Sequence, residues 1–111
     1  MDESKRHWDR LRMLSREWNF YSEAVHEASK KIRKREDKRV LMRSRVNGGV
    51  EGFFYHNGHG LALRTKDRDY NLGDMAHSAR LFLGKPIFGL TCFSQGEIRE
   101  MAGYLEASLE D

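Results

Sequence analysis

Apolar residues in the first third of the chain recur every three or four positions, the spacing that places them on one face of an α-helix. They are Leu11, Leu14, Trp18, Tyr21, Val25, Ala28 and Ile32. Glycine and proline, the residues that most reliably stop a helix, do not occur before position 47. The pattern therefore predicts one helix from about Ser4, a suitable N-cap, to about Asp37.

The apolar face of this predicted helix could serve two purposes. An unbroken helix over these positions is roughly 50 Å long, whereas a globule of this size is only ~34 Å across, so the helix overhangs its own domain. Its a and d positions either pack on the sheet of the same chain or pair with a second copy in a homodimer, and the sequence leaves both open. These positions are Leu11, Leu14, Trp18, Tyr21, Val25 and Ile32. A break at residues 18–21, with Ser22 as a new cap, would instead give a helical hairpin that needs no partner.

The rest of the chain alternates between short apolar runs and glycine-rich turns. Residues 40–46 and 50–55 predict two strands separated by a turn. The pair Asn57-Gly58 then stands between apolar runs, and this pair is typical of a two-residue hairpin turn, so a third strand is expected to follow it. The charged residues 66–69 predict a loop.

A second helix and a fourth strand are expected next. Residues 75–83 predict a helix with Asn71 or Asp74 as its N-cap and Gly84 at its end. Residues 87–93 are mostly apolar and predict a buried strand.

The chain ends in a further helix, whose start is indicated by a capping box of Ser94 and Glu97. The predicted order is α-β-β-β-α-β-α. This is an α+β fold in which a long N-terminal helix, or helical hairpin, precedes a mainly antiparallel sheet of three to four strands with two further helices. We divide the single folding unit into a helical segment with a basic end, residues 1–38, and a compact α+β part, residues 39–111.

Composition narrows the class of protein. At 111 residues the chain has room for one domain. Its single cysteine, Cys92, excludes an intramolecular disulfide, and no stretch approaches the ~18 apolar residues of a membrane span. We therefore expect a reduced, soluble and cytoplasmic protein without a membrane partner.

Positive charge is concentrated in the first part of the chain. Residues 1–46 hold 14 Lys and Arg against 8 Asp and Glu, a net charge of +6, whereas residues 47–111 hold 6 against 9, a net charge of −3. The densest cations are Lys30, Lys31, Arg33, Lys34, Arg35, Lys38, Arg39, Arg43 and Arg45. Because the two acids among them cannot neutralise nine bases, we expect these residues to bind an anionic partner, nucleic acid or a nucleoprotein complex. The plainer alternative is a solvated helix end whose cations complement the helix dipole.

Residues suited to catalysis are sparse. His56 and His59 flank the predicted hairpin tip, but a zinc site needs three or four ligands, and the other histidines are scattered. Asp67, Asp69 and Asp74 fall in one loop region where they could hold Mg²⁺, yet the interleaved Lys and Arg favour a solvated loop. The sequence therefore predicts no metal, no cofactor and no catalytic residue.

These observations favour a binding protein without catalysis, which uses the basic end of its N-terminal helix to engage nucleic acid or a nucleoprotein complex. Two alternatives remain open. A small accessory or inhibitor protein, of the kind found in phages and mobile elements, would dock on a larger protein machine through the same cations. A small nuclease or toxin would use His56 and His59, or the three aspartates.

Overall fold

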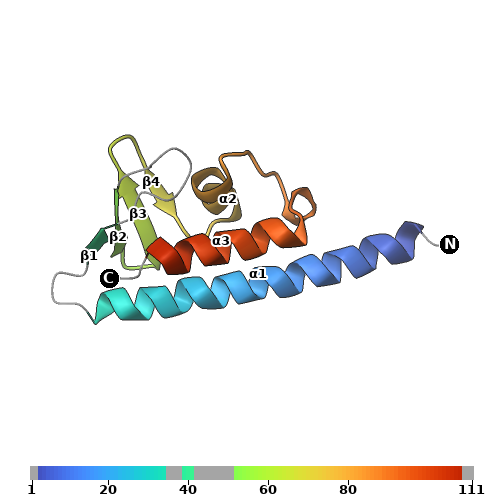
Figure 1. The fold of residues 1–111 in the computed structure, drawn as a ribbon, viewed down its shortest axis with the longest axis horizontal. Helices are drawn as coiled ribbons and strands as arrows, with labels where there is room; N and C mark the ends of the chain where they lie inside the picture. The colour runs from blue at the N-terminus through green and yellow to red at the C-terminus, as the bar shows by residue number, and fades with distance from the viewer. Residues whose placement is uncertain (1–2, 35–38, 42–51, 109–111) are drawn as a thin grey trace.

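The computed structural model describes residues 3–34, 39–41 and 52–108 and shows an α+β fold. In chain order its elements are α1 (Glu3–Arg33), β1 (Arg39–Leu41), β2 (Gly52–His56), β3 (Leu61–Thr65), β4 (Asp69–Asn71), α2 (Met75–Leu83), the short 3-10 helix η1 (Leu90–Cys92) and α3 (Gln95–Ser108). The predicted class is confirmed, because a long N-terminal helix comes first and two further helices accompany an antiparallel sheet (Figure 1).

The N-terminal helix α1 is unbroken over 31 residues, so the helical hairpin is not formed. Ser4 lies inside the helix rather than at its N-cap, and residues 35–37 of the predicted helix lie outside the described part. Figure 1 shows the N-terminal end projecting beyond the rest of the protein, and the side chains from Ser4 to Arg10 are exposed, which confirms the predicted overhang. None of the helices within the described residues is apolar enough over a sufficient length to cross a membrane.

The sheet is an antiparallel meander in the order β1-β2-β3-β4. The rest of the predicted first strand, residues 42–46, lies outside the described part. The hairpin between β2 and β3 stands where the Asn-Gly pair predicted it, but its loop has four residues, 57–60, rather than two. The reason is local: the side-chain oxygen of Asn57 accepts hydrogen bonds from the backbone N–H groups of His59 and Gly60 (2.8 and 3.0 Å), which holds the longer loop.

A strand that was not predicted, β4, follows the charged residues 66–68, which form a loop as predicted. Asp69 begins β4 and pairs opposite Arg64, whose guanidinium donates to both of its carboxylate oxygens (2.8 and 2.9 Å). This bidentate ion pair stabilises the Asp69 carboxylate, although aspartate is otherwise unfavourable in a strand. The helix α2 follows as predicted, with Asp74 as its N-cap, accepting from the His77 N–H (3.1 Å), and Gly84 at a φ of 66° as its C-cap.

The strand predicted at residues 87–93 is wrong. Ile87 and Phe93 reach the core, but Phe88 between them is 92% exposed. The chain closes into η1 instead, where the Phe93 N–H donates to the Leu90 carbonyl (3.2 Å). Only the ends of this apolar run are buried, and the run pairs with none of the described strands.

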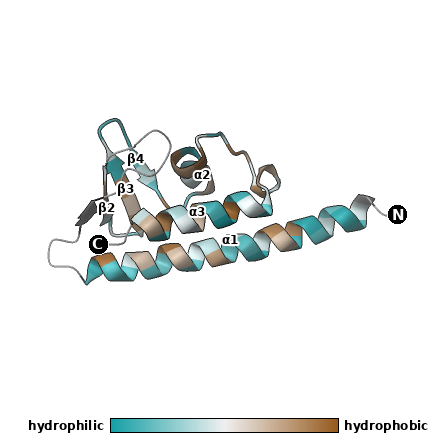
Figure 2. Ribbon diagram, in the orientation of Figure 1, coloured by the Kyte–Doolittle hydropathy of each residue, from teal (hydrophilic) through white to brown (hydrophobic). Residues whose placement is uncertain are grey.

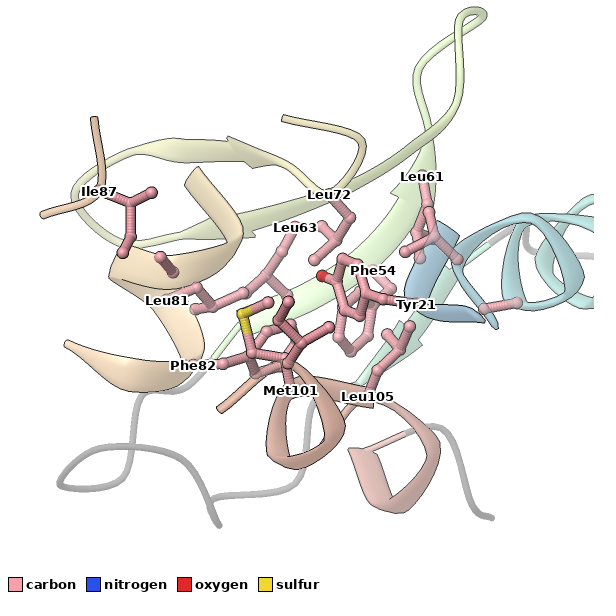
Figure 3. Packing of buried hydrophobic residues seen from close by; sticks show 14 of the residues in the cluster. Tyr21, Phe54, Leu61, Leu63, Leu72, Leu81, Phe82, Ile87, Met101 and Leu105 are labelled. Carbon is pink, nitrogen blue, oxygen red and sulfur yellow. The ribbon is translucent and has the colours of Figure 1, made fainter. Parts of the chain in front are cut away.

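The core lies where α1 crosses the sheet and α3 (Figure 3). On the predicted apolar face of α1, Leu11 and Trp18 are half-buried, and the other side chains are buried. The latter pack in one cluster with Phe54, Leu63 and Leu105 of the same chain. They are Leu14, Tyr21, Val25, Ala28 and Ile32. The face that could have paired with a second copy is therefore occupied within the chain.

A buried hydrogen-bond chain connects α1 to α2 and the end of the sheet. The Tyr21 hydroxyl donates to the Ser78 hydroxyl (2.8 Å), which in turn donates to the Leu72 carbonyl (2.8 Å). Burial raises the pKa of Tyr21, so this hydroxyl remains a proton donor. Together with the buried apolar face, this chain of hydrogen bonds orients α1 about its own axis.

The helix α3 starts at the predicted capping box and is tied to α1 by charge. The Glu97 N–H donates to the Ser94 hydroxyl (3.1 Å), and the Ser94 N–H donates to the Glu97 carboxylate (2.8 Å). One turn further on, Arg99 donates to the carboxylate of Glu17 (2.9 Å), which Gln95 also contacts (2.7 Å). The hydrogen bond from Arg99, and then that from Gln95, lower the pKa of Glu17.

Candidate functional site

Beside its buried face, α1 presents two flanks, one toward the β2–β3 hairpin and one toward α3. Successive residues of an α-helix turn by about 100°, so residues three or four apart share a flank and direct neighbours do not. Figure 2 shows the resulting alternation of hydrophobic and hydrophilic residues along α1, in contrast to the mostly hydrophobic α2. Each flank borders a hollow in the surface, and the two hollows have different chemistry.

The hollow toward the hairpin has a volume of about 480 Å³, and we call it the histidine groove. It is lined by Ser22, Val25, His26, Ser29 and Arg33 of α1 and, opposite them, by His56, His59, Gly60, Leu61, Asn71 and Gly73. Three histidines from distant parts of the sequence thus border one groove. They do not form a metal site, since the described residues contain no group of three metal-ligating side chains placed to hold an ion.

Local hydrogen bonds indicate which groups of the lining residues can donate. The Gly58 N–H donates to Nδ1 of His56 (3.1 Å), so the neutral ring carries its proton on Nε2 and offers a donor there. The side-chain oxygen of Asn71 accepts from the Gly73 N–H (3.2 Å), which leaves the amide NH₂ of Asn71 to donate elsewhere. With Arg33, the groove therefore offers mainly hydrogen-bond donors.

The described lining of the histidine groove contains no aspartate or glutamate. Arg33 is exposed, and no carboxylate of the described residues lies within ion-pair distance of it. A guanidinium beside imidazole, amide and hydroxyl groups suits an anion, and phosphate in particular accepts the fork of donors that arginine presents.

A second hollow, of about 320 Å³, adjoins the same end of α1. Its described lining is Lys30, Arg33 and Lys34, and we call it the basic hollow. Arg33 lines both hollows, so they form one surface at the C-terminal end of α1. Lys30 also pairs with Glu27 (3.3 Å), but both side chains are exposed, and pairs of this kind contribute little.

The hollow on the other flank has a volume of about 520 Å³ and lies between α1 and α3; we call it the acidic groove. It is lined by Phe20, Glu23, Ala24, Glu27, Ala28, Lys31, Leu105 and Glu106. Its three carboxylates surround an apolar floor, and Lys31 is the one cation among the described lining residues. A single stretch of sequence therefore supplies cations to two chemically opposite places.

The nine predicted cations divide accordingly. Lys30, Arg33 and Lys34 lie together at the basic hollow, whereas Lys31 faces the acidic groove. Arg39 lies in β1, and the remaining four lie outside the described residues. These four are Arg35, Lys38, Arg43 and Arg45.

The sequence pattern did not indicate that three histidines lie together. His56 and His59 lie at the hairpin tip as predicted, but His26, which appeared isolated, borders the same groove. A signal existed: His26 and Arg33, seven residues apart, share one flank of the helix, as do Ser22 and Ser29. What the sequence could not show is which strand loop faces that flank.

Two of the three aspartates have structural roles of their own. Asp69 is held by Arg64, which lowers the pKa of that carboxyl, and Asp74 caps α2. Asp67 is exposed in the turn between β3 and β4. The structure thus gives no support to a magnesium site built from these residues.

Comparison of the chain with protein-family models, with curated proteins and with solved structures finds no match in any of the three. The function is therefore argued from the chemistry of the site alone.

Proposed function

We propose that the protein binds nucleic acid through its phosphates, on the surface formed by the histidine groove and the basic hollow. The observation that carries this proposal is the lining of the groove, where Arg33 and three histidines meet without a carboxylate among the described residues. Folding alone does not require so many donors to converge. An anion that accepts their hydrogen bonds makes the arrangement favourable.

A polymer of phosphates fits this surface better than a single small anion does. Arg33 joins two neighbouring hollows, and Lys30 and Lys34 continue the positive charge beyond the groove. In the sequence, Arg35 follows directly, and Lys38 follows after Glu36 and Asp37. Each phosphate that these groups neutralise releases counterions, so affinity accumulates along a strand.

The same chemistry predicts weak sequence preference. Contacts to phosphates position a nucleic acid but do not distinguish its bases. The groove could hold one nucleotide, since its volume of about 480 Å³ lies within the ordinary range of ligand sites. We therefore expect binding to many sequences, with an affinity dominated by salt.

The test is a titration of labelled duplex DNA and single-stranded RNA, followed by fluorescence anisotropy at several salt concentrations. The logarithm of the affinity should fall linearly with the logarithm of the salt concentration. The triple variant Lys30→Ala, Arg33→Ala, Lys34→Ala should bind more weakly, and its salt slope should fall by about one for each phosphate that the variant no longer neutralises.

A matched control removes three exposed positive charges elsewhere. The variant Lys5→Ala, Arg6→Ala, Arg80→Ala has the same net charge as the first triple variant but leaves both hollows intact. If the control loses as much affinity as the test variant, net charge rather than this surface explains binding. If the wild-type protein binds neither nucleic acid even at low salt, the proposal fails and an acidic protein surface becomes the expected partner.

A further inference from the structure

The flank of α1 that faces the acidic groove also carries exposed apolar side chains. Phe20 is 61% exposed and Met13 37% exposed, and the two lie seven residues apart on the same side of the helix. Ala24 continues this line toward the groove, whose floor it shares with Leu105. This apolar strip is separate from the buried face of α1, because it lies on the far side of Glu17.

Charges along the strip are ordered about Phe20. In one direction the chain places Arg16, Arg12 and then Asp9, and in the other direction Glu23, Glu27 and then Lys31. Each of the three charges N-terminal to Phe20 therefore has a charge of opposite sign at nearly the same distance on the C-terminal side. In an antiparallel pair centred on Phe20, Asp9 of one copy lies opposite Lys31 of the other, and Arg16 and Arg12 lie within one residue of the positions opposite Glu23 and Glu27. Glu17, which lies opposite Glu23, is already paired with Arg99.

The acidic groove of one copy is suited to receive the N-terminal half of the strip of the other copy. In an antiparallel pair centred on Phe20, residue 13 of one copy lies beside residue 27 of the other. Met13 would then reach the apolar floor formed by Ala24, Ala28 and Leu105. Arg12 and Arg16, which precede and follow Met13 in the sequence, would reach the carboxylates on the rim of the groove.

We propose that two copies of the chain pair antiparallel through this strip, with a two-fold axis at Phe20. Such an interface is self-complementary, because each copy contributes both the inserted Met13 and the groove that receives it. Phe20 and Met13 are exposed, so the strip is accessible to a second copy at these positions. The pairing involves neither the histidine groove nor the basic hollow, so it stands or falls independently of nucleic-acid binding.

The first test is the molar mass in solution, measured by light scattering and sedimentation over a range of concentrations. The wild-type protein should show a monomer–dimer equilibrium. Phe20→Asp should shift it to monomer by at least about tenfold in dissociation constant, because two charges then meet at the axis. A wild-type protein that remains monomeric at every concentration overturns the proposal and leaves the groove to a different, basic partner.

Charge reversal provides the sharper test. An acidic variant, Arg12→Glu with Arg16→Glu, and a basic variant, Glu23→Lys with Glu27→Lys, should each be monomeric because like charges then face each other. Mixed in equal amounts, they should form a heterodimer, since every pair is again of opposite sign. A control variant, Lys66→Glu with Arg80→Glu, should dimerise like the wild type. Failure of the mixture to associate, with both variants folded by circular dichroism, overturns the proposal.

Cross-linking reports the direction of the helices. In a Cys92→Ser background, Asp9→Cys in one copy and Lys31→Cys in the other should form a disulfide under mild oxidation. Each variant alone should cross-link poorly, since residue 9 of one copy is far from residue 9 of the other in an antiparallel pair. Preferential cross-linking of each variant with itself would show a parallel pair and would contradict the two-fold axis at Phe20.

Discussion

The two flanks of α1 differ in almost every chemical respect although they belong to the same helix. The flank toward the hairpin joins Arg33 to three histidines without a described carboxylate, whereas the flank toward α3 sets three carboxylates around an apolar floor. Direct neighbours such as His26 and Glu27 line different hollows. The chemistry of a helix is therefore set flank by flank, and a charge count over a stretch of sequence averages two different surfaces.

The flanks are also held in place by different forces. Toward the sheet, α1 is fixed by apolar packing and by the buried bond from Tyr21 to Ser78. Toward α3, it is fixed by the charged contact of Glu17 with Arg99 at the edge of the core. The two attachments should consequently respond differently to substitution and to pH.

The largest effect is expected from removing the packing under the hairpin. Phe54 is fully buried and clusters with Tyr21, as Figure 3 shows, so Phe54→Ala leaves a cavity and should lower the free energy of unfolding by about 3–5 kcal/mol. Urea denaturation measures the change. Phe88→Ala is the control: this side chain is 92% exposed, and its loss should change stability by less than about 0.5 kcal/mol. Equal losses in the two variants would mean that the hairpin side of α1 is not held by this packing.

A smaller effect is expected from the buried hydrogen bond alone. Tyr21→Phe keeps the ring and removes the donor to Ser78, so the free energy of unfolding should fall by about 0.5–1.5 kcal/mol. Tyr104→Phe serves as the control, because the Tyr104 hydroxyl makes no hydrogen bond within the described residues. A Tyr21→Phe variant as stable as the wild type would assign the attachment on this side to apolar contacts only.

The smallest effect, and the one that depends on pH, concerns the attachment to α3. Because Arg99 and Gln95 lower the pKa of Glu17 in the folded protein, its charge adds stability above the pKa of the unfolded chain, about 4.3. That contribution is lost as the pH falls through the lower folded-state pKa. Glu17→Gln should therefore lower the melting temperature at neutral pH, and the difference should vanish in acid.

Thermal unfolding at a series of pH values measures this difference between Glu17→Gln and the wild type. Glu100→Gln, an exposed substitution without a described ion pair, should show no such convergence. If the melting temperatures of Glu17→Gln and the wild type differ by the same amount at every pH, the contact with Arg99 acts through shape rather than charge.

Most of the fold followed from local signals. The apolar period of α1 and the caps at Asp74 and Ser94 each act within a few residues and predicted their elements correctly, and the Asn-Gly pair located the hairpin but not the length of its loop. The errors concern residues 87–93 and the four-residue hairpin loop. Both depended on which hydrogen-bond partners were within reach, and the residue types alone do not state that.

The candidate site was only half visible in the sequence. The density of cations near Arg33 was plain, but their division between two flanks depends on the rotation of α1, which follows from the packing of its buried face and from the bond between Tyr21 and Ser78. The meeting of His26 with His56 and His59 depended on the hairpin lying beside α1. Such contacts across 30 residues of chain are set by tertiary packing, for which a single sequence holds little direct information.

The length of the unbroken helix α1 would also set the distance between the two basic ends of a dimer. From Phe20 to Ile32, in the middle of the basic end, the helix rises by roughly 18 Å, so an antiparallel dimer would hold its two basic ends roughly 36 Å apart. One turn of B-DNA repeats every ~34–36 Å. A pair of these chains would thus present its cations to the same face of a duplex at successive turns, and inserting or deleting a helical turn in α1 would put them out of step.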